Sequence, residues 1–370
     1  MTIDAIDIYH VRMPLIKPWR TAYGSDDSIE SIVVRICAQG GHGWGESSPL
    51  AMPFYSPEYA AGVFGILRDC LAPCLLGKAI TSGSELQLAL APFKGNSFAK
   101  AALDTAWWDL HASALGEPLY RVLGGSNPHV SCGADFGIGE SVEKLVEDVG
   151  AALSLGAPRI KLKYAPGWDL PVVEKIRETF PEAVFHIDCN AAYSLSDLPM
   201  FRELDRFQLA MFEQPLAFND LVDHAEMRTQ VETPLCLDES INSLHALEQA
   251  ITLQACQWVN IKPGRVGGLT VALQIHDLCQ AHKIPCWVGG MLESAVGAMH
   301  CAALATLPNI RYANDLFPSE KFYAEDLSTP SIAFPSPWTC VLGSAPGVGA
   351  KPKSELLKRW TVNHISLSIL

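Results

Sequence analysis

The sequence lacks both an excess of basic residues and a long hydrophobic run. Its 27 lysines and arginines stand against 40 aspartates and glutamates, which gives a formal net charge of -13. Because binding to nucleic-acid phosphates needs a basic surface, we expect no nucleic-acid partner. No apolar run reaches the roughly 18 residues of a membrane-spanning helix. The opening stretch MTIDAIDIYHVRMPL is acidic where a signal peptide would be basic, so we expect a cytoplasmic protein with no membrane association.

Paired cysteine spacings are also missing, although the chain has 11 cysteines. Cys70 and Cys74 lie about one helical turn apart, and the others are scattered through segments that resemble helices and strands. A disulfide framework or a zinc site would need recurring short spacings. We therefore interpret the cysteines as buried thiols.

What the sequence does contain predicts two domains. With 370 residues, 49% of them hydrophobic, the chain exceeds the usual size of one domain and can bury a large core. The first 50 or so residues alternate in the manner of β-strands, and 57–125 show helical spacing. We expect an α+β N-terminal domain over residues 1–125, and we expect residues 329–370 to pack back on it.

Residues 126–328 change to short apolar strands that alternate with amphipathic helices. Parallel strands need helical crossovers, so this order predicts an α/β fold with a TIM-like barrel. We expect eight strand–helix units, with strands at VSCGADFGI, RIKLKY, VFHIDC, LAMFEQ, PLCLDES, WVNIKPG, PCWVGG and IRYANDL.

Five charged residues at the ends of these strands recur at a nearly constant interval. Lys163, Asp188, Glu213, Asp238 and Lys262 are separated by 25, 25, 25 and 24 residues. One strand–helix unit per step would place them at equal heights on successive strands, so they would meet at the C-terminal mouth of the barrel. Any one of them alone would be interpreted as a loop or salt-bridge residue. Five residues with this period indicate a catalytic site.

Three carboxylates brought together repel one another unless a cation joins them. A hard divalent ion with oxygen ligands meets this need, so Asp188, Glu213 and Asp238 are predicted to bind Mg²⁺, with Mn²⁺ as an alternative. Zinc does not fit, because these strand ends carry no His or Cys except Cys189, whose side chain should point outward.

The two lysines of the series flank the predicted metal site. If a substrate carboxylate binds there, its α-carbon lies between Lys163 and Lys262, and a neutral lysine can remove the α-proton to give an enediolate. Lys161 shares a strand face with Lys163, and its charge is expected to lower the Lys163 pKa towards neutrality. A Schiff-base lysine is the competing interpretation, but it leaves the three carboxylates unexplained.

The chain resembles the enolase superfamily, in particular the o-succinylbenzoate synthase and N-acylamino acid racemase family of its muconate-lactonizing subgroup. The similar motifs are RIKLKYAPGWD, HIDCNAAY, FEQPL, PLCLDES, VNIKPGRVGG and WVGGMLES, and the likeness extends over nearly the whole chain. The resemblance implies a (β/α)7β barrel with an α+β N-terminal capping domain, Mg²⁺ on the three carboxylates, a small-molecule carboxylate substrate and a homo-oligomer. It also implies that Lys163 is the general acid/base and that Lys262 faces it.

The resemblance further predicts residues that shape the pocket. Asn190 is expected to support the site after the first metal ligand. Lid segments are expected near residues 18–26 and 50–60, with Gly24 as a hinge. The lid segments would bring Arg20, Tyr23, Phe54 and Tyr55 to the substrate, and the GGMLES loop of the barrel would contribute Gly289, Gly290, Met291, Glu293 and Ser294.

Two positions depart from the family pattern. Asp135 stands where the family more often has a small hydroxyl residue, so an extra negative charge would face the pocket and disfavour an anionic succinyl tail. The stretch YANDLFPSE lacks the D-x-D that holds a substrate ammonium in related dipeptide epimerases, which counts against that activity.

Two reactions fit the same lysines. We rank first the syn dehydration that forms o-succinylbenzoate in menaquinone synthesis, in which Lys163 removes the α-proton and returns a proton to the departing hydroxide. The alternative is racemisation of N-acylamino acids, including N-succinylamino acids, which needs both lysines as bases. Arg265 follows Lys262 by three residues and is expected either to lower the Lys262 pKa, which favours racemisation, or to be a loop arginine that pairs with an acid. Muconate cycloisomerase and a non-catalytic binding barrel rank lower.

Overall fold

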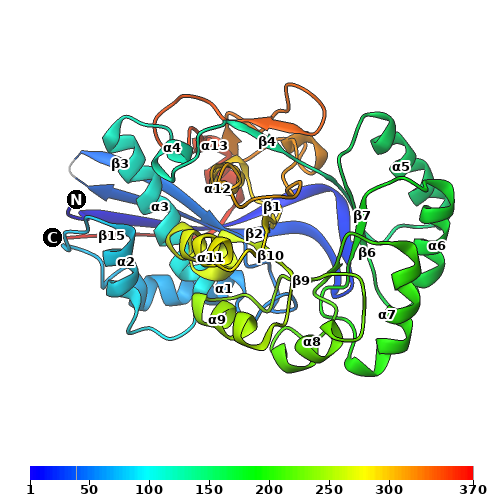
Figure 1. Ribbon diagram of the computed structural model, residues 1–370. Coiled ribbons are helices and arrows are strands. Elements are labelled where there is room, and N and C mark those ends of the chain that lie inside the picture. Colours follow the sequence, from blue (N-terminus) through cyan, green and yellow to red (C-terminus); the bar gives the residue numbers. More distant parts are fainter. Residues whose placement is uncertain (39, 370) are drawn as a thin grey trace.

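The computed structural model describes residues 1–38 and 40–369. It consists of an antiparallel sheet with its own helices and a parallel sheet that is surrounded by helices (Figure 1). Figure 1 shows both chain ends at the outer end of the antiparallel sheet, away from the helices α5 to α7. No helix in the described part of the chain has the length and apolar character needed to cross a membrane.

The antiparallel sheet has four strands in the order β15-β1-β2-β3. The alternating residues at the start of the chain form β1 (Ala5–Thr21), β2 (Gly24–Ala38) and β3 (Gly41–Ser47). The fourth strand, β15 (Thr361–Ser368), comes from the far end of the sequence and pairs with β1 from Ala5↔Ser368 to Val11↔Thr361. The last part of the chain therefore returns to the N-terminal sheet.

One face of this sheet is covered by α3 (Ser97–Leu115), which packs against β3. The glycines of GHGWGES allow this close approach, because a Cβ at Gly43 or Gly45 would overlap backbone atoms of α3. Gly116 ends α3 in the left-handed conformation with φ 71°. The other helices of this domain are α1 (Ala60–Ile66), which continues into a π-helical turn at Leu67–Leu71, α2 (Gly83–Leu90) and α4 (Leu119–Val122).

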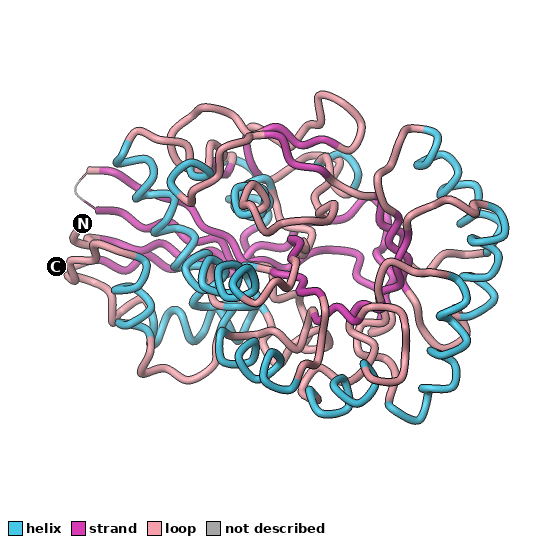
Figure 2. Tube along the Cα trace, viewed as in Figure 1, coloured by secondary structure: helices cyan, strands magenta, loops and turns pink. Residues whose placement is uncertain are grey.

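The parallel sheet has seven strands in sequence order, with helices outside it (Figure 2). Its strands are β5 (Ala134–Phe136), β6 (Ile160–Lys163), β7 (Phe185–Asp188), β8 (Phe212–Glu213), β9 (Leu235–Leu237), β10 (Trp258–Ile261) and β11 (Cys286–Val288). Its helices are α5 (Val142–Ser154), α6 (Leu170–Thr179), α7 (Leu198–Leu204), α8 (Leu221–Arg228), α9 (Leu244–Leu253), α10 (Pro263–Val266), α11 (Leu269–Ala281) and α12 (Ala295–Leu304).

The expectation of eight strand–helix units is corrected at both ends of the barrel. VSCGADFGI splits into β5 and β4 (His129–Ser131), and β4 pairs with β13 (Thr339–Val341) instead of joining the barrel. The eighth segment, around Asn314 and Asp315, does not form a regular strand, but its backbone hydrogen bonds close the sheet. Asp315 N donates to Val288 O at 2.9 Å on one side, and Gly133 N donates to Asn314 O at 3.0 Å on the other. Hydrogen bonds to both neighbours therefore complete a (β/α)7β barrel.

The remaining short elements belong to the C-terminal part and the barrel loops. Strands β12 (Ser328–Thr329) and β14 (Lys351–Pro352) pair with each other, and α13 (Ser354–Trp360) leads into β15. Three 3₁₀ turns lie at Leu195–Asp197, Asp205–Phe207 and Ser319–Lys321.

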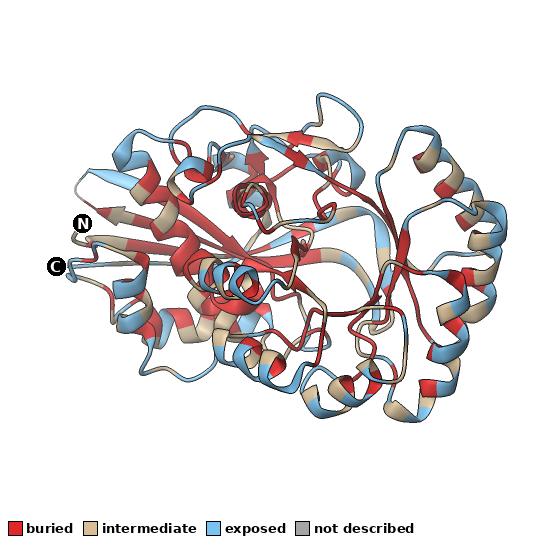
Figure 3. Ribbon diagram, in the orientation of Figure 1, coloured by how far each residue is buried: buried red, intermediate tan, exposed pale blue. Residues whose placement is uncertain are grey.

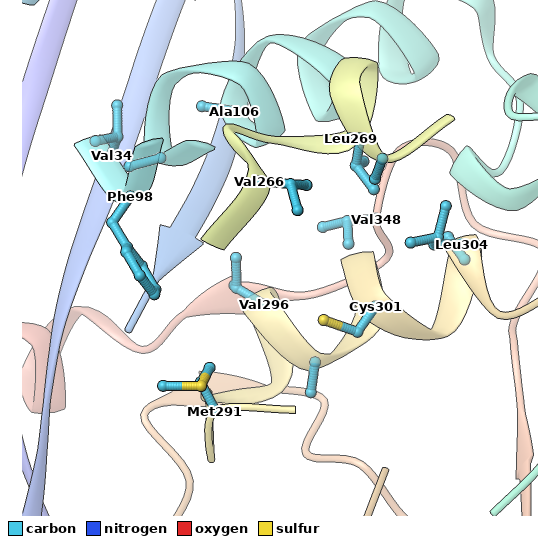
Figure 4. Packing of buried hydrophobic residues seen from close by; sticks show 14 of the residues in the cluster. Val34, Phe98, Ala106, Val266, Leu269, Met291, Val296, Cys301, Leu304 and Val348 are labelled. Atoms are coloured by element: carbon cyan, nitrogen blue, oxygen red, sulfur yellow. The ribbon is translucent and has the colours of Figure 1, made fainter. Parts of the chain in front are cut away.

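A continuous apolar core joins the capping domain to the barrel. Figure 3 shows that the strands of the barrel are largely buried, whereas the outer faces of the helices α5 to α7 are exposed. Val34 of β2 and Phe98 of α3 belong to the same buried cluster as Val266 of α10 and Val296 of α12 (Figure 4). The cap is therefore held on the barrel by burial of shared apolar surface.

Candidate active site

The five charged residues with the 25-residue period lie at the C-terminal ends of successive barrel strands. Lys163, Asp188 and Glu213 are the last residues of β6, β7 and β8, and Asp238 and Lys262 directly follow β9 and β10. The strand register sets Lys163 beside Asp188, and Asp188 beside Glu213. All five are buried. The structure therefore brings them together in surroundings where charges interact strongly.

Each lysine of the series forms an ion pair with one carboxylate. Lys163 Nζ lies 2.7 Å from Asp188 Oδ2, and Lys262 Nζ lies 2.8 Å from Asp238 Oδ2. Both lysines line the same cavity. Burial alone would lower the pKa of each lysine, but the nearby carboxylates outweigh it and raise the pKa of both. The carboxylate contacts therefore favour the protonated, ammonium form of both lysines.

Lys161 contacts three carboxylates at once. Its Nζ lies 2.9 Å from Asp188 Oδ2, 3.0 Å from Glu213 Oε2 and 3.0 Å from Asp315 Oδ2. The charge of Lys161 lowers the pKa of Lys163, as predicted, but the carboxylates around Lys163, chiefly Asp188, leave that pKa raised. The prediction of a near-neutral Lys163 is therefore wrong in this structure, because both lysines share Asp188 as a partner.

The three carboxylates supply the oxygen donors that a hard divalent cation prefers. Burial and then the charge of Asp188 raise the pKa of Glu213 to about 7, so these carboxylates repel one another at close range. In residues 1–38 and 40–369, no three Asp, Glu, His or Cys side chains are placed to hold an ion directly. The ammonium groups of Lys161, Lys163 and Lys262 pair with the carboxylates instead. The donor chemistry fits a divalent cation, and binding requires these lysine contacts to open.

Arg265 is buried and forms an ion pair with Asp238. Its Nη1 donates to Tyr55 Oη at 2.9 Å, and Lys262 Nζ donates to the same oxygen at 3.1 Å. The Arg265 charge lowers the pKa of Lys262, as predicted, but Asp238 acts more strongly and the pKa of Lys262 is raised. The expected low pKa of Lys262 is therefore not found, and Tyr55 links the capping domain to the second lysine.

The cavity above these groups has a volume of about 40 Å³. That is room for a few water molecules and not for a substrate, so parts of the capping domain must move for a substrate to enter. Of the residues predicted to shape the pocket, those that line this cavity are Tyr23, Tyr55, Asp135, Lys161, Asn190, Gly290 and Met291. Trp19, Asp26 and Leu50, which belong to the predicted lid segments but were not singled out, also line it. The remaining lining residues outside the predictions are Ile29, Leu292, Asp315 and Phe317.

The other predicted pocket residues lie outside this cavity. Phe54 is 66% exposed, and Arg20 lies in the hairpin formed by β1 and β2, where it pairs with Ser25. The predicted lid segment at residues 18–26 forms the tip of this hairpin, since the strand pairing continues up to the turn. Gly24 lies in that turn with φ 144°.

The GGMLES loop lines the cavity with Gly290 and Met291, and its other residues hold neighbouring groups in place. A Cβ at Gly289 would overlap Asn260 Oδ1 and would lie 2.6 Å from Lys262 Cε, so glycine leaves the space that the lysine occupies. Glu293 Oε2 accepts a hydrogen bond from Met291 N at 2.8 Å, which fixes the turn of the loop. Ser294 N donates to Glu46 Oε1 of the capping domain at 3.0 Å.

Several residues of the site were missed from the sequence. Asn260 Nδ2 donates to Glu213 Oε1 at 2.7 Å, and Asp315 pairs with both Arg159 and Lys161. Asn190 Nδ2 donates at 3.2 Å to the buried Glu239. Strand alternation could have shown that Asn260 shares a face with Lys262, two residues later.

Comparisons with known proteins agree with this arrangement. Residues 4–124 match the mandelate racemase / muconate lactonizing enzyme N-terminal domain, and residues 144–356 match the enolase C-terminal domain-like family. An N-succinylamino acid racemase of Amycolatopsis sp is 40% identical over 99% of both chains. An o-succinylbenzoate synthase of Geobacillus kaustophilus is 38% identical over 98% of this chain and 96% of its own.

The solved structures confirm the fold. A crystal structure of an enolase superfamily member from Listeria innocua superposes with a TM-score of 0.95 at 33% identity, covering 100% of this chain and 99% of that one. The sequence matches, the capping domain and the barrel all support the resemblance seen in the motifs. The chain is therefore an enzyme of the enolase superfamily and belongs to its mandelate racemase / muconate lactonizing enzyme subgroup.

Proposed function

We propose that the protein moves a proton at the α-carbon of a succinylated carboxylate, and that racemisation of N-succinylamino acids is the reaction that its geometry supports best. The observation that carries this proposal is the pair of lysines, Lys163 and Lys262. They line one cavity from strands on either side of the carboxylates, and each has its own acidic partner. A racemase needs one acid/base group on each face of the α-carbon.

The proposed metal ligands are Asp188, Glu213 and Asp238, and members of this superfamily typically use a divalent metal ion. When bound, such an ion would neutralise the carboxylates and the negative charge that develops on the substrate carboxylate. Asn260 would hold Glu213 in place through its 2.7 Å hydrogen bond.

The chain's own residues would carry the proton. With the L-substrate, one lysine removes the α-proton and the other, still protonated, donates to the opposite face, and the D-substrate reverses these roles. Tyr55 and Arg265 would hold the Lys262 side chain at its side of the cavity. Exclusion of water from this buried site would protect the intermediate from stray protons.

Dehydration to o-succinylbenzoate is the second candidate, because relatives of about equal similarity carry either name. It needs one acid/base lysine, which the Lys163–Asp188 pair can provide. Lys262 would then remain a cation beside the intermediate. Both reactions share the first proton transfer, so the role of Lys262 separates them.

The variant Lys262→Ala tests this assignment. If racemisation uses two bases, the variant loses interconversion of N-succinyl-L- and D-amino acids but still exchanges the α-proton of one enantiomer for deuterium. NMR in D₂O measures both. Exchange that is unchanged for both enantiomers would contradict the two-base proposal. Lys353→Ala, at an exposed pair with Glu325, serves as the control.

A further inference from the structure

A second and much larger cavity adjoins the active-site cavity, next to β5 and α5. Its volume is about 700 Å³, and the side chains of Phe136, Phe334 and Trp338 form much of its apolar lining. Asp135 and Phe317 line both cavities. These two residues therefore form the partition between the reacting groups and a space large enough for the distal part of a substrate.

Lys321 lies at this partition and retains an unpaired charge. Its Nζ donates to the backbone oxygen of Asp135 at 3.3 Å and lies 3.9 Å from the ring centroid of Phe317 and 5.2 Å from that of Phe322. It forms no salt bridge with any residue of the described ranges 1–38 and 40–369. By contrast, the active-site lysines all pair with carboxylates.

A succinylated substrate needs a cationic group near the end of its acyl chain, and Lys321 is placed to supply one. It carries a second carboxylate at the end of the acyl chain, and a carboxylate that leaves water needs a cationic partner. The cations inside the small cavity are already paired with the carboxylates around the reacting carbon. Lys321 forms no salt bridge within the described residues, and it contacts the ring of Phe317, which lines that cavity.

We propose that Lys321 binds the distal carboxylate of the substrate's acyl group, which reaches it through an opening between Asp135 and Phe317 into the larger cavity. The acyl chain would pass the ring of Phe317, which is only partly buried. The ligand class is therefore an N-acylamino acid, or a comparable carboxylate, with a dicarboxylic acyl chain. This inference rests on the proposed function.

Asp135 does not oppose this arrangement. Its hydrogen bond with Lys321 uses the backbone oxygen, so the Lys321 ammonium remains available to a substrate carboxylate. The side chain is buried and its Oδ1 has no hydrogen-bond partner. Burial, followed by the charge of Asp315, raises the pKa of Asp135 and favours the protonated form. A protonated Asp135 can donate a hydrogen bond to a passing carboxylate or carbonyl oxygen.

The test compares two substrates that differ at the distal end of the acyl group: N-succinyl-L-methionine carries a terminal CH₂CO₂⁻ group that N-acetyl-L-methionine lacks. In Lys321→Met the ratio of kcat/KM for the succinyl over the acetyl substrate should fall about tenfold or more, because a charge-assisted contact is lost. Lys321→Arg should keep most of the wild-type ratio, and Lys353→Met, at a half-buried lysine that lines neither cavity, should leave it unchanged. A ratio in Lys321→Met equal to the wild-type ratio would overturn the proposal.

Binding measured without turnover separates this inference from the proposed function. Calorimetric titration of the wild-type protein and Lys321→Met with both ligands should show the same selective loss of affinity for the succinyl ligand. Loss of affinity for both ligands alike would show that Lys321 has a structural role only and would refute the inference. If wild type turns over neither substrate but binds the succinyl ligand through Lys321, the proposed reaction fails while the binding site stands.

Discussion

The position of Lys262 depends on the lack of a side chain at Gly289. Gly289 lies at the end of β11, next to Asn260 and the aliphatic stem of Lys262. A methyl group at this position would overlap Asn260 Oδ1 and would lie 2.6 Å from Lys262 Cε. Both neighbours are buried, so neither can move aside without disturbing its own partners, Glu213 and Asp238.

Gly289→Ala is therefore expected to damage the site more than the fold. We expect α-proton exchange to fall at least tenfold and the free energy of unfolding to fall by about 1–3 kcal/mol, the usual cost of overpacking. NMR exchange and thermal unfolding measure the two effects. Gly343→Ala is the control, since the nearest atom to its Cβ is 4.0 Å away. Full exchange activity in Gly289→Ala would show that Lys262 needs no such space.

The sequence predicted those residues of the site that follow a period, and it missed those that do not. The series from Lys163 to Lys262 could be found because each strand–helix unit has nearly the same length. Asp315 lies on the closing segment, which has no helix after it to continue the series. The pKa values of Lys163 and Lys262 could not be predicted either, because they depend on carboxylate distances that spacing does not give.

At the scale of elements, Glu46 joins the capping sheet to the barrel. It lies on β3, and its carboxylate accepts hydrogen bonds from Ser294 N and Gly297 N at 3.0 Å, at the N-terminus of α12. Acidic groups are favourable at this end of a helix. Burial nevertheless dominates and raises the pKa of Glu46 to about 7.

The raised pKa predicts a pH dependence of stability. The folded protein binds the Glu46 proton more tightly than the unfolded chain, whose glutamate has a pKa near 4.5. The stability from this group is therefore complete below pH 4.5 and is lost as the pH rises to about 7. As the pH rises from 4.5 to about 7, the free energy of unfolding of Glu46→Gln should increase by roughly 3 kcal/mol relative to that of wild type.

Denaturant unfolding at several pH values measures this difference. Glu355→Gln is the matched control, because Glu355 is exposed in the first turn of α13. A difference between Glu46→Gln and wild type that stays constant from pH 4.5 to 7 would show that Glu46 is charged throughout.

Elements were predicted well where a periodic pattern continued through the segment. The apolar strands from β6 to β11 all lie where they were expected. The first predicted strand splits because the backbone amides of Cys132 and Gly133 donate hydrogen bonds outside β5, Cys132 N to Trp338 O beside β13 and Gly133 N to Asn314 O of the closing segment. The glycine and paired aspartates of residues 18–26 occur in loops as well as in hairpin turns, so the sequence does not distinguish the hairpin tip found there from a loop.

At the scale of the molecule, the cap and the barrel form one apolar core around a closed site. Trp19, Tyr23 and Tyr55 of the cap line the active-site cavity together with the lysines of the barrel. The shared core keeps the domains together, so we expect substrate entry to involve local movement of segments that line the cavity, such as the β1–β2 hairpin, and not separation of the domains. The lining of the cavity therefore comes from both parts of the chain.

The most direct test of the central claim is α-proton exchange in D₂O, followed by NMR with N-succinyl-L- and D-methionine. The wild-type protein should exchange both enantiomers, lose this activity when EDTA removes divalent ions, and regain it with Mg²⁺. Exchange that continues undiminished in EDTA, or that is absent with Mg²⁺ present, would contradict an active site built from three metal-binding carboxylates and two acid/base lysines.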